Sequence, residues 1–239
     1  MGMVLHVNAG LVERDTIRAM PTPPPTATHF PLPHISLVDM VKFSLNYFGH
    51  DVVDEHHALT EDGDSYFGLL TLRTKDGQYG DVVGLRNNHT KKFPAGISFG
   101  SRTFVCDNLA FSGDTVVNRR HTKKLRQELP SIVAGIVEPL RQKRERQHDQ
   151  FQLYQGTALT DSEADQLIMQ LYRRGAINVT RIADVLSAYE NPPFDWGTER
   201  SAWRLFQATT YALEGRIAEN PGATAKLHDV IDSVCERLN

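Results

Sequence analysis

Two copies of the tetrapeptide His-Thr-Lys-Lys, at His89–Lys92 and His121–Lys124, carry the side chains with the clearest chemistry in this sequence. The basic side chains in and around them are Arg86, His89, Lys91, Lys92, Arg102, Arg119, Arg120, His121, Lys123 and Lys124. Phenylalanines are interleaved with these cations. Clustered cations neutralise phosphates and aromatic faces stack on bases, as sequence-tolerant single-strand binding requires. We therefore expect these ten residues to form a nucleic-acid-binding surface.

Other chemistries find less support in the residue pattern. His56 and His57 are adjacent, so on a strand they face opposite sides and do not address one metal ion together. Cys106 follows Phe-Val in what reads as a strand interior, where cysteine behaves as a small apolar residue. The glycines lack the spacing of a dinucleotide fingerprint or a phosphate loop. We expect no catalytic residue, no metal and no cofactor.

The elements that position the cations are predicted to form an α+β core. Apolar residues at helical spacing predict a helix over His34–Phe48, ended by Gly49. The predicted strands are Asp51–Leu59, Tyr66–Thr74, Gln78–Leu85, Ala95–Ser101 and Arg102–Phe111. A long basic helix is expected to open at Thr115 or Asn118 and to run to about His148, with a break or kink at Pro130.

The final third of the sequence predicts a helical bundle. Thr160 and Glu163 form a capping box ahead of a helix that Gly175 closes. Further helices are expected at Val179–Tyr189, Glu199–Ile217 and Ala223–Leu238. The fold class is thus α+β, an antiparallel β-meander with a long basic helix, followed by a C-terminal helical bundle.

Three regions follow from this reading. The proline-rich residues 1–33 are predicted to be an extended arm that lies across the body or onto a neighbouring subunit. Residues 34–150 form the α+β core domain, and residues 151–239 form the helical C-terminal domain.

Charge is distributed unevenly although the chain carries a net charge of only −3. Residues 118–146 contain nine basic and three acidic side chains, which favours an anionic partner. Within them Arg141, Lys143, Arg144 and Arg146 are interpreted as a solvated helix end. Two cysteines, no secretory signal and no long apolar run predict a cytoplasmic protein without a membrane partner.

The central block of the sequence carries a family resemblance. VGLRNNHTKKFPAGISFGSRTFVCDNLAFSG, followed by RRHTKK, resembles the phage- and plasmid-borne proteins of domain-of-unknown-function family 932. The similarity runs from about His34 to the C-terminus. It implies a mobile-element origin, most simply a phage or prophage, and action in the cytoplasm of a bacterial host. It transfers no catalytic residues.

A second resemblance concerns architecture. A helix ending in Phe48-Gly49, a Lys-Asp-Gly-Gln-Tyr hairpin, further strands and a basic helix are similar to the core of single-strand annealing recombination proteins. Those proteins form rings and hold single-stranded DNA in a basic groove between sheet and helix. The insertion NNHTKKF and the separate C-terminal bundle depart from their pattern.

Three functional hypotheses remain open at this point. The first is a phage-type protein that binds or anneals single-stranded DNA in recombination, as a homo-oligomer and without covalent chemistry. The second is an anti-defence module that binds a host protein, or a nucleotide signal through Arg86, His89 and Arg120. The third is an enzyme that processes nucleic acid. Its candidate site residues are Cys106, Asp107 and His121.

Overall fold

The strand-forming segments in the middle of the chain pair as an antiparallel sheet in which most neighbours are consecutive along the sequence. The structure, a computed structural model, describes residues 9–74, 79–103, 109–111, 117–197, 199–213 and 222–238. Within them the strands lie in the order β1-β2-β3-β4-β5-β6, and β7 also pairs with β5. Their bounds are β1 Gly10–Val12, β2 Val52–Leu59, β3 Ser65–Leu72, β4 Tyr79–Asn88, β5 Ala95–Thr103, β6 Leu109–Phe111 and β7 Val117–Arg119.

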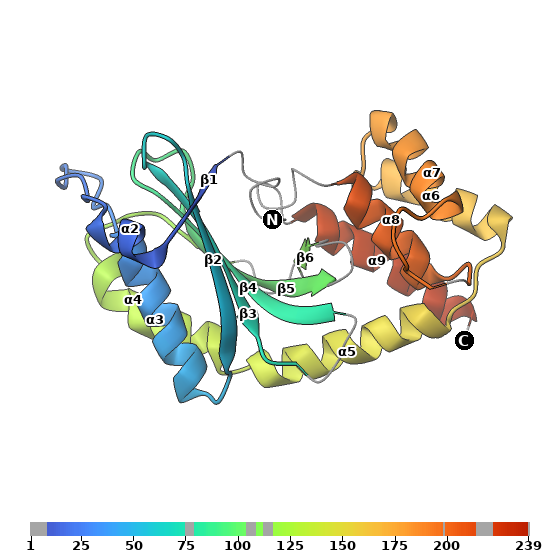
Figure 1. Ribbon diagram of the computed structural model, residues 1–239, viewed down its shortest axis with the longest axis horizontal. Coiled ribbons are helices and arrows are strands. Elements are labelled where there is room, and N and C mark those ends of the chain that lie inside the picture. The colour runs from blue at the N-terminus through green and yellow to red at the C-terminus, as the bar shows by residue number, and fades with distance from the viewer. Residues whose placement is uncertain are drawn as a thin grey trace.

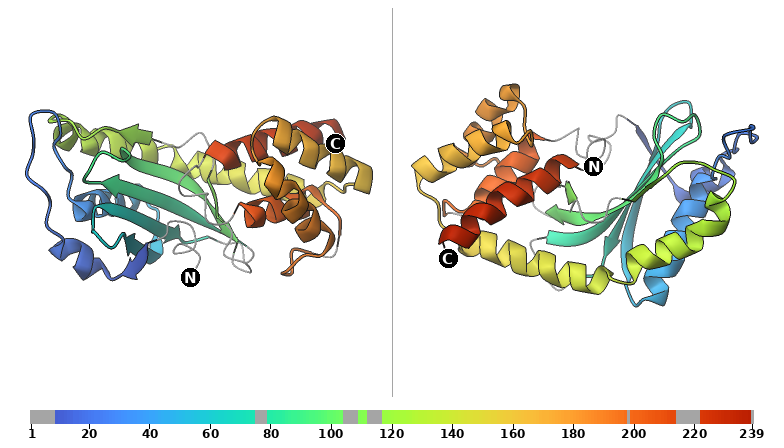
Figure 2. Two further views of the ribbon diagram at one scale, coloured as in Figure 1. Left: turned by 90° about the horizontal axis from the view of Figure 1, so that it is seen from above. Right: turned by 180° about the vertical axis from the view of Figure 1, so that it is seen from behind.

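Two helices, α3 (His34–Tyr47) and α4 (Leu125–Val137), cover one face of this sheet (Figure 1 and Figure 2). Leu37, Val41 and Leu129 face the sheet from these helices and are buried. Alternate strand residues complete the cluster, namely Tyr66, Leu70, Val83, Leu85, Ile97 and Phe99. We call this side of the sheet the helix face.

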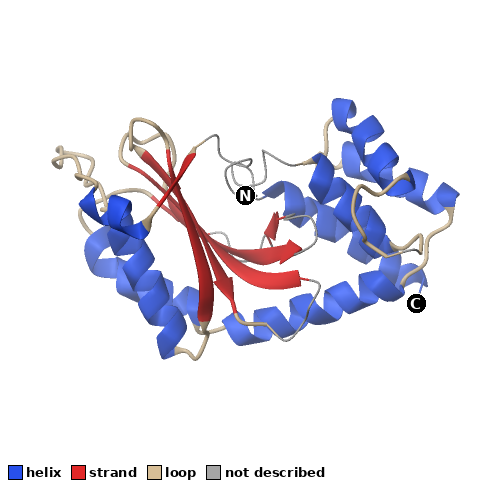
Figure 3. Cartoon of the chain, viewed as in Figure 1, coloured by secondary structure: helices blue, strands red, loops and turns tan. Residues whose placement is uncertain are grey.

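The opposite face of the sheet shares a hydrophobic cluster with the C-terminal helices. Ala58, Phe67, Leu69 and Val82 belong to it, as the period of two along each strand requires. Helix α5 (Leu140–Gly156) runs from the sheet to the bundle (Figure 1 and Figure 3). The bundle contains α6 Asp161–Arg173, the 3₁₀ turn Val179–Arg181, α7 Ile182–Glu190, α8 Ala202–Ala212 and α9 Gly222–Leu238.

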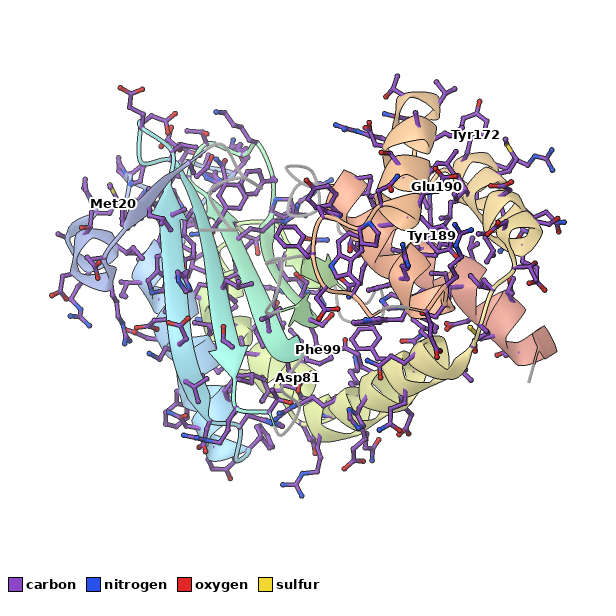
Figure 4. The ribbon with its side chains drawn as sticks, turned by 45° about the vertical axis from the view of Figure 1, so that its right-hand side comes forward. Met20, Asp81, Phe99, Tyr172, Tyr189 and Glu190 are labelled. Atoms are coloured by element: carbon purple, nitrogen blue, oxygen red, sulfur yellow. The ribbon has the colours of Figure 1, made fainter. Side chains whose placement is uncertain are left out.

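Arg144 fastens α5 to the sheet. Its Nε donates to Asp81 Oδ2 at 2.5 Å, and its Nη2 donates to the carbonyl of Arg73 at 2.5 Å. Gln147 donates to the other oxygen of Asp81 at 3.2 Å, and Figure 4 shows Asp81 beside α5. The prediction that Arg144 lies on a solvated helix end is therefore wrong, because the guanidinium neutralises a carboxylate that is buried at the end of the sheet.

Residues 9–33, predicted as an extended arm, lie across the body. Strand β1 pairs with the end of β2, and the short helix α2 (Arg14–Ala19) buries Ile17 against the helix-face cluster. The following residues 20–33 carry no regular secondary structure and are called the strap below. The predicted domain boundary at residue 150 lies inside α5, which is unbroken there.

The mixed α+β class, the antiparallel meander and the helical C-terminal region are confirmed. The start of the basic helix differs from the prediction, because Val117–Arg119 pairs with β5 and α4 begins only at Leu125. The break lies at Glu138-Pro139 rather than at Pro130, which sits inside α4. Proline at 139 lacks the amide that would continue α4. Residues 75–78 of the predicted Lys-Asp-Gly-Gln-Tyr hairpin lie outside the described residues, as does Cys106.

The capping box at the start of α6 gives a first stability prediction. Thr160 Oγ1 accepts from the Glu163 amide at 3.3 Å, and the Glu163 carboxylate accepts from the Thr160 amide at 2.8 Å. Replacing Thr160 by alanine is expected to lower the free energy of unfolding by about 1 kcal/mol. Urea denaturation followed by circular dichroism measures it. Thr180→Ala, outside the α-helices on an exposed turn, is the control and is expected to change stability less.

Candidate functional site

The two His-Thr-Lys-Lys copies meet at one end of the sheet. Strand β4 ends at Asn88, so the first copy forms the turn into β5. Strand β7 pairs with the start of β5, with Arg119 opposite Ala95. The second copy therefore leaves the sheet beside that turn. Residues more than 30 positions apart in the sequence are brought together by this pairing.

The histidines of both copies join two histidines of the N-terminal region in a buried group. We call His29, His34, His89 and His121 the histidine cluster. The rings of His34 and His89 stack with centroids 3.9 Å apart, and those of His29 and His121 stack at 5.1 Å. All four residues are at most 8% exposed. The cluster is thus part of the interior and not of the surface.

Hydrogen bonds to the backbone fix the orientation of three of the four rings. His29 Nε2 lies 2.8 Å from the carbonyl oxygen of His89, and His89 Nε2 lies 3.1 Å from that of Leu32. His34 Nε2 lies 3.1 Å from the carbonyl oxygen of Gly63. Since carbonyl oxygens only accept, each of these nitrogens carries the proton. The strap is held between the two His-Thr-Lys-Lys copies by these contacts.

His121 is the exception within the cluster, because neither of its ring nitrogens has a hydrogen-bond partner. The pKa of His121 is lowered to about 4, chiefly by burial and in addition by the neighbouring His29 and His89. Burial lowers the pKa of His34 to about 4 as well, again with a contribution from His89. These imidazoles are therefore neutral near pH 7.

Their burial corrects one part of the predicted surface. His89 is 4% exposed and His121 is 5% exposed, so neither reaches a ligand on the outside. The predicted role of His89 and His121 as donors to nucleic acid is therefore wrong for this conformation. Both rings instead pack between the strap and the end of the sheet.

The histidine cluster is not arranged as a metal centre. Its rings lie face to face, whereas ligands to one ion would point their nitrogens at a common centre. Among the described residues no group of three or more histidine, cysteine, aspartate or glutamate side chains is placed to hold a metal ion. His57 Nδ1 lies 2.9 Å from the hydroxyl of Tyr66, whose ring stacks on His34 with centroids 5.4 Å apart.

Outside the histidine cluster, the basic residues of the two copies remain exposed. We call this set the cationic rim. It consists of Lys91, Lys92, Arg119, Arg120, Lys123 and Lys124. Within the described part of the chain none of the six has a carboxylate at ion-pair distance. Asn88 Oδ1 accepts from the amides of Thr90 at 2.9 Å and Lys92 at 2.8 Å, which shapes the turn that presents the first two lysines.

One end of the cationic rim has an acidic neighbour. The Thr60 hydroxyl and the Asp64 amide lower the pKa of Asp62, and the charge of Lys92 lowers it further. Asp62 lies in the β2–β3 turn, which is next to the β4–β5 turn because Ser65 pairs with Asn88. At the other end, no described carboxylate lies at ion-pair distance from Arg119, Arg120, Lys123 or Lys124, and Glu128, one turn after Lys124, is the acidic residue in the first turn of α4.

Arg86 belongs to the other face of the sheet. It lies on β4 four residues after Val82, which packs in the cluster opposite α3 and α4, whereas the next residue, Asn87, contacts His34 of α3. Arg86 Nη2 donates to Asn118 Oδ1 at 2.8 Å, and the guanidinium carbon lies 5.5 Å from the centre of the Phe93 ring. A pocket that combines Arg86 with His89 is thus not formed. The backbone of Arg102 lies in β5, and its side chain lies outside the described part of the structure.

A groove between α3 and α4 is a second surface feature, with a volume of about 700 Å³. Its lining includes Met40, Phe43 and Tyr47, and the last two are 70% and 76% exposed. Asp39 is the charged residue of the lining, and it already pairs with Arg14 at 2.5 Å. A mostly apolar groove with an acidic edge does not suit a polyanion.

Sequence reasoning missed His29, His34 and Asn87 as partners of the two copies. Asn87 Nδ2 donates to the Leu32 carbonyl at 2.8 Å and lies 2.8 Å from His34 Nδ1. These contacts join residues more than 50 positions apart, so no local pattern announces them. The opposite orientation of Arg86 and Asn87, in contrast, follows from strand alternation once β4 extends to Asn88.

Comparison with known proteins adds no assignment. The chain matches no protein-family model, and no match was found among curated proteins or solved structures. The resemblances to family 932 and to annealing proteins therefore stay predictions. No helix in the described part of the chain combines the length and apolar character that crossing a membrane requires.

Proposed function

We propose that the protein binds single-stranded nucleic acid, with single-stranded DNA favoured, through the cationic rim and without covalent chemistry. One observation supports this most. Lysines and arginines from two distant segments lie at the same end of the sheet, and no described carboxylate pairs with them. The histidine cluster beneath holds those segments together.

Unpaired surface cations of this kind attract a polyanion for a general physical reason. Each phosphate that a lysine or arginine neutralises releases condensed counterions, so affinity rises as salt falls. Cations that already pair with carboxylates contribute little, because the protein supplies the counter-charge itself. The cationic rim lacks such pairs in the described residues. A salt-dependent affinity for nucleic acid is thus the property to measure.

The remaining parts of the proposal follow from the resemblances. A phage or other mobile-element origin and action in the bacterial cytoplasm follow from family 932. The resemblance to annealing proteins supports a homo-oligomer that anneals strands in recombination. Light scattering measures the mass of the particle with and without an oligonucleotide, and a monomer under both conditions contradicts this part.

Charge reversal at Lys123→Glu/Lys124→Glu is expected to lower affinity for a single-stranded 20-mer by at least about tenfold in low salt. The slope of affinity against salt should fall by about 1.4, since two contacts are removed at about 0.7 each. Both lysines precede α4, where acidic residues favour the helix dipole, so folding is not expected to suffer. Fluorescence anisotropy over a salt series measures both quantities.

Arg173→Glu/Arg174→Glu provides the matched control, because it makes the same change in net charge at the exposed end of α6. Its affinity should stay within about twofold of the unchanged protein once salt screens distant charges. Equal losses in both variants would mean that binding follows net charge and that the cationic rim is not the site. If the unchanged protein shows no salt-dependent affinity for the oligonucleotide, the proposed function is wrong.

A further inference from the structure

Arg86 is a half-buried cation without a carboxylate partner among the described residues. It lies on β4, on the face of the sheet opposite α3 and α4. Burial lowers the pKa of its guanidinium from the ordinary value, because few charges nearby replace the lost water. A protein tolerates an uncompensated charge of this kind poorly unless something anionic meets it.

Two neighbours contact the Arg86 side chain, and a third supports one of them. Asn118 Oδ1 accepts from its Nη2 at 2.8 Å, and the Phe93 ring lies under the guanidinium carbon at 5.5 Å. Phe67 packs against Phe93 with ring centroids 5.5 Å apart, so that ring is itself supported. A planar guanidinium on an aromatic face loses less freedom when it binds a further group.

Gly96 leaves the room in which the Arg86 side chain lies. Gly96 lies on β5, where it pairs with Arg86 of β4 on one side and with Asn118 of β7 on the other. A methyl group at this position would lie 2.9 Å from Asn118 Oδ1 and 3.0 Å from both Cγ and Nε of Arg86. Any other residue at position 96 would therefore push the guanidinium away from its amide partner.

Most hydrogen-bond donors of Arg86 remain available. A guanidinium has five N–H donors, and one of its nitrogens bonds to Asn118. Arg86 is half-buried and has no polar side-chain atom that is both fully buried and unpartnered, so its free donors keep some contact with solvent. A fixed fork of N–H groups fits two oxygens of a phosphate.

From this arrangement we infer that Arg86, Asn118 and Phe93 form a phosphate subsite that receives one phosphate of a flexible strand held by the cationic rim. The inference rests on the proposed function and names its ligand group. Because Arg86 is half-buried in the sheet, a phosphate that reaches it must be displaced from the line of the adjacent phosphates in the strand. A single strand bends in this way, whereas the phosphates of a duplex stay on the outside of a stiff helix. A free nucleotide offers the same phosphate chemistry.

Gly96→Ala is the sharpest test, because it changes no charge. Its affinity for a single-stranded 20-mer is expected to fall about tenfold, the size expected for losing charge-assisted hydrogen bonds. Arg86→Gln should lose at least as much and should lower the salt slope by about 0.7. Binding of a 20-base-pair duplex should change less than twofold in both, since it uses the cationic rim alone.

Gly135→Ala is the matched control, since a methyl group there meets nothing within 4 Å. Asn118→Ala adds no volume and removes the oxygen that aligns Arg86, so it carries the test if Gly96→Ala folds poorly. Thermal unfolding of each variant monitors folding. The subsite is wrong if Asn118→Ala and Arg86→Gln keep the single-strand affinity of the unchanged protein. If Lys123→Glu/Lys124→Glu loses affinity in the same assay, the proposed function still stands.

The opposite failure is also distinguishable. If the unchanged protein binds neither oligonucleotide, the proposed function is wrong, and calorimetry with adenosine monophosphate and with inorganic phosphate decides the subsite. Binding that Arg86→Gln abolishes assigns the phosphate subsite to a free nucleotide or to phosphate alone, according to which probe binds. Absence of binding by both probes overturns the subsite as well.

Discussion

Replacing Arg144 by methionine is expected to lower the free energy of unfolding by about 3–5 kcal/mol. Methionine fills much of the same volume but leaves the Asp81 carboxylate buried without its counter-charge. It also removes the donor to the Arg73 carbonyl. Because Arg144 joins α5 to the sheet, the loss should appear in global unfolding and not only in fraying of the helix. Urea denaturation at pH 7 measures it.

Arg141→Met is the matched control for this prediction. It makes the same chemical change one turn earlier on α5, where the side chain is exposed, and should alter stability by no more than about 0.5 kcal/mol. The double variant Asp81→Leu/Arg144→Met should recover much of the loss, because an apolar pair replaces an ion pair without leaving a charge behind. A loss below about 1 kcal/mol in Arg144→Met alone contradicts the assigned role of the pair.

Stability is expected to fall by about 2 kcal/mol for each of His34 and His121 when the pH is lowered from 7 to 5. The folded protein holds the pKa of each at about 4, below the ordinary value of 6.5. Unfolding therefore takes up protons as the pH drops below 6.5, and the loss is complete near pH 4. Burial also lowers the pKa of His89, so this residue adds to the loss of stability. The charge of Asp64 raises the same pKa and reduces that contribution.

Two measurements separate this effect from ordinary acid unfolding. Carboxylates that the fold stabilises, such as Glu55, titrate below pH 4.5, so the interval from pH 7 to pH 5 reports on histidines. His121→Phe keeps an aromatic ring on His29 and removes two unpartnered nitrogens, so it should be more stable at pH 5 and flatten the profile. An unaltered slope in His121→Phe would show that the lowered pKa of His121 does not govern the acid response.

The C-terminal helices were predictable because their signals are local. Thr160 and Glu163 announce the start of α6 within four residues, and the structure contains that capping box. Most strands of the meander were predictable for the same reason, but the predicted start of a strand at Arg102 is wrong, because β5 continues to Thr103 and β6 covers Leu109–Phe111. Val117–Arg119 was not predictable, since its pairing with β5 depends on partners 20 to 24 positions earlier.

The candidate site was predictable in its charges but not in its geometry. The exposed lysines and arginines are visible as a cluster in the sequence, whereas the burial of His89 and His121 depends on the strap and on ring stacking. Arg144 shows the same limit. It sits in a run of basic residues that reads as a solvated end, and only Asp81, 63 positions earlier, removes it from solvent.

The strap has a practical consequence for anyone who works with a shortened protein. Its backbone receives hydrogen bonds from Asn87, His89 and Arg126, and its Phe30 amide donates to the carbonyl of His121 at 2.9 Å. A shortened protein that starts at His34, the predicted start of the core domain, would lack the strap that contacts both His-Thr-Lys-Lys copies. Loss of binding in such a fragment would then reflect a dismantled scaffold, and assays of ligand affinity are best run on the entire polypeptide.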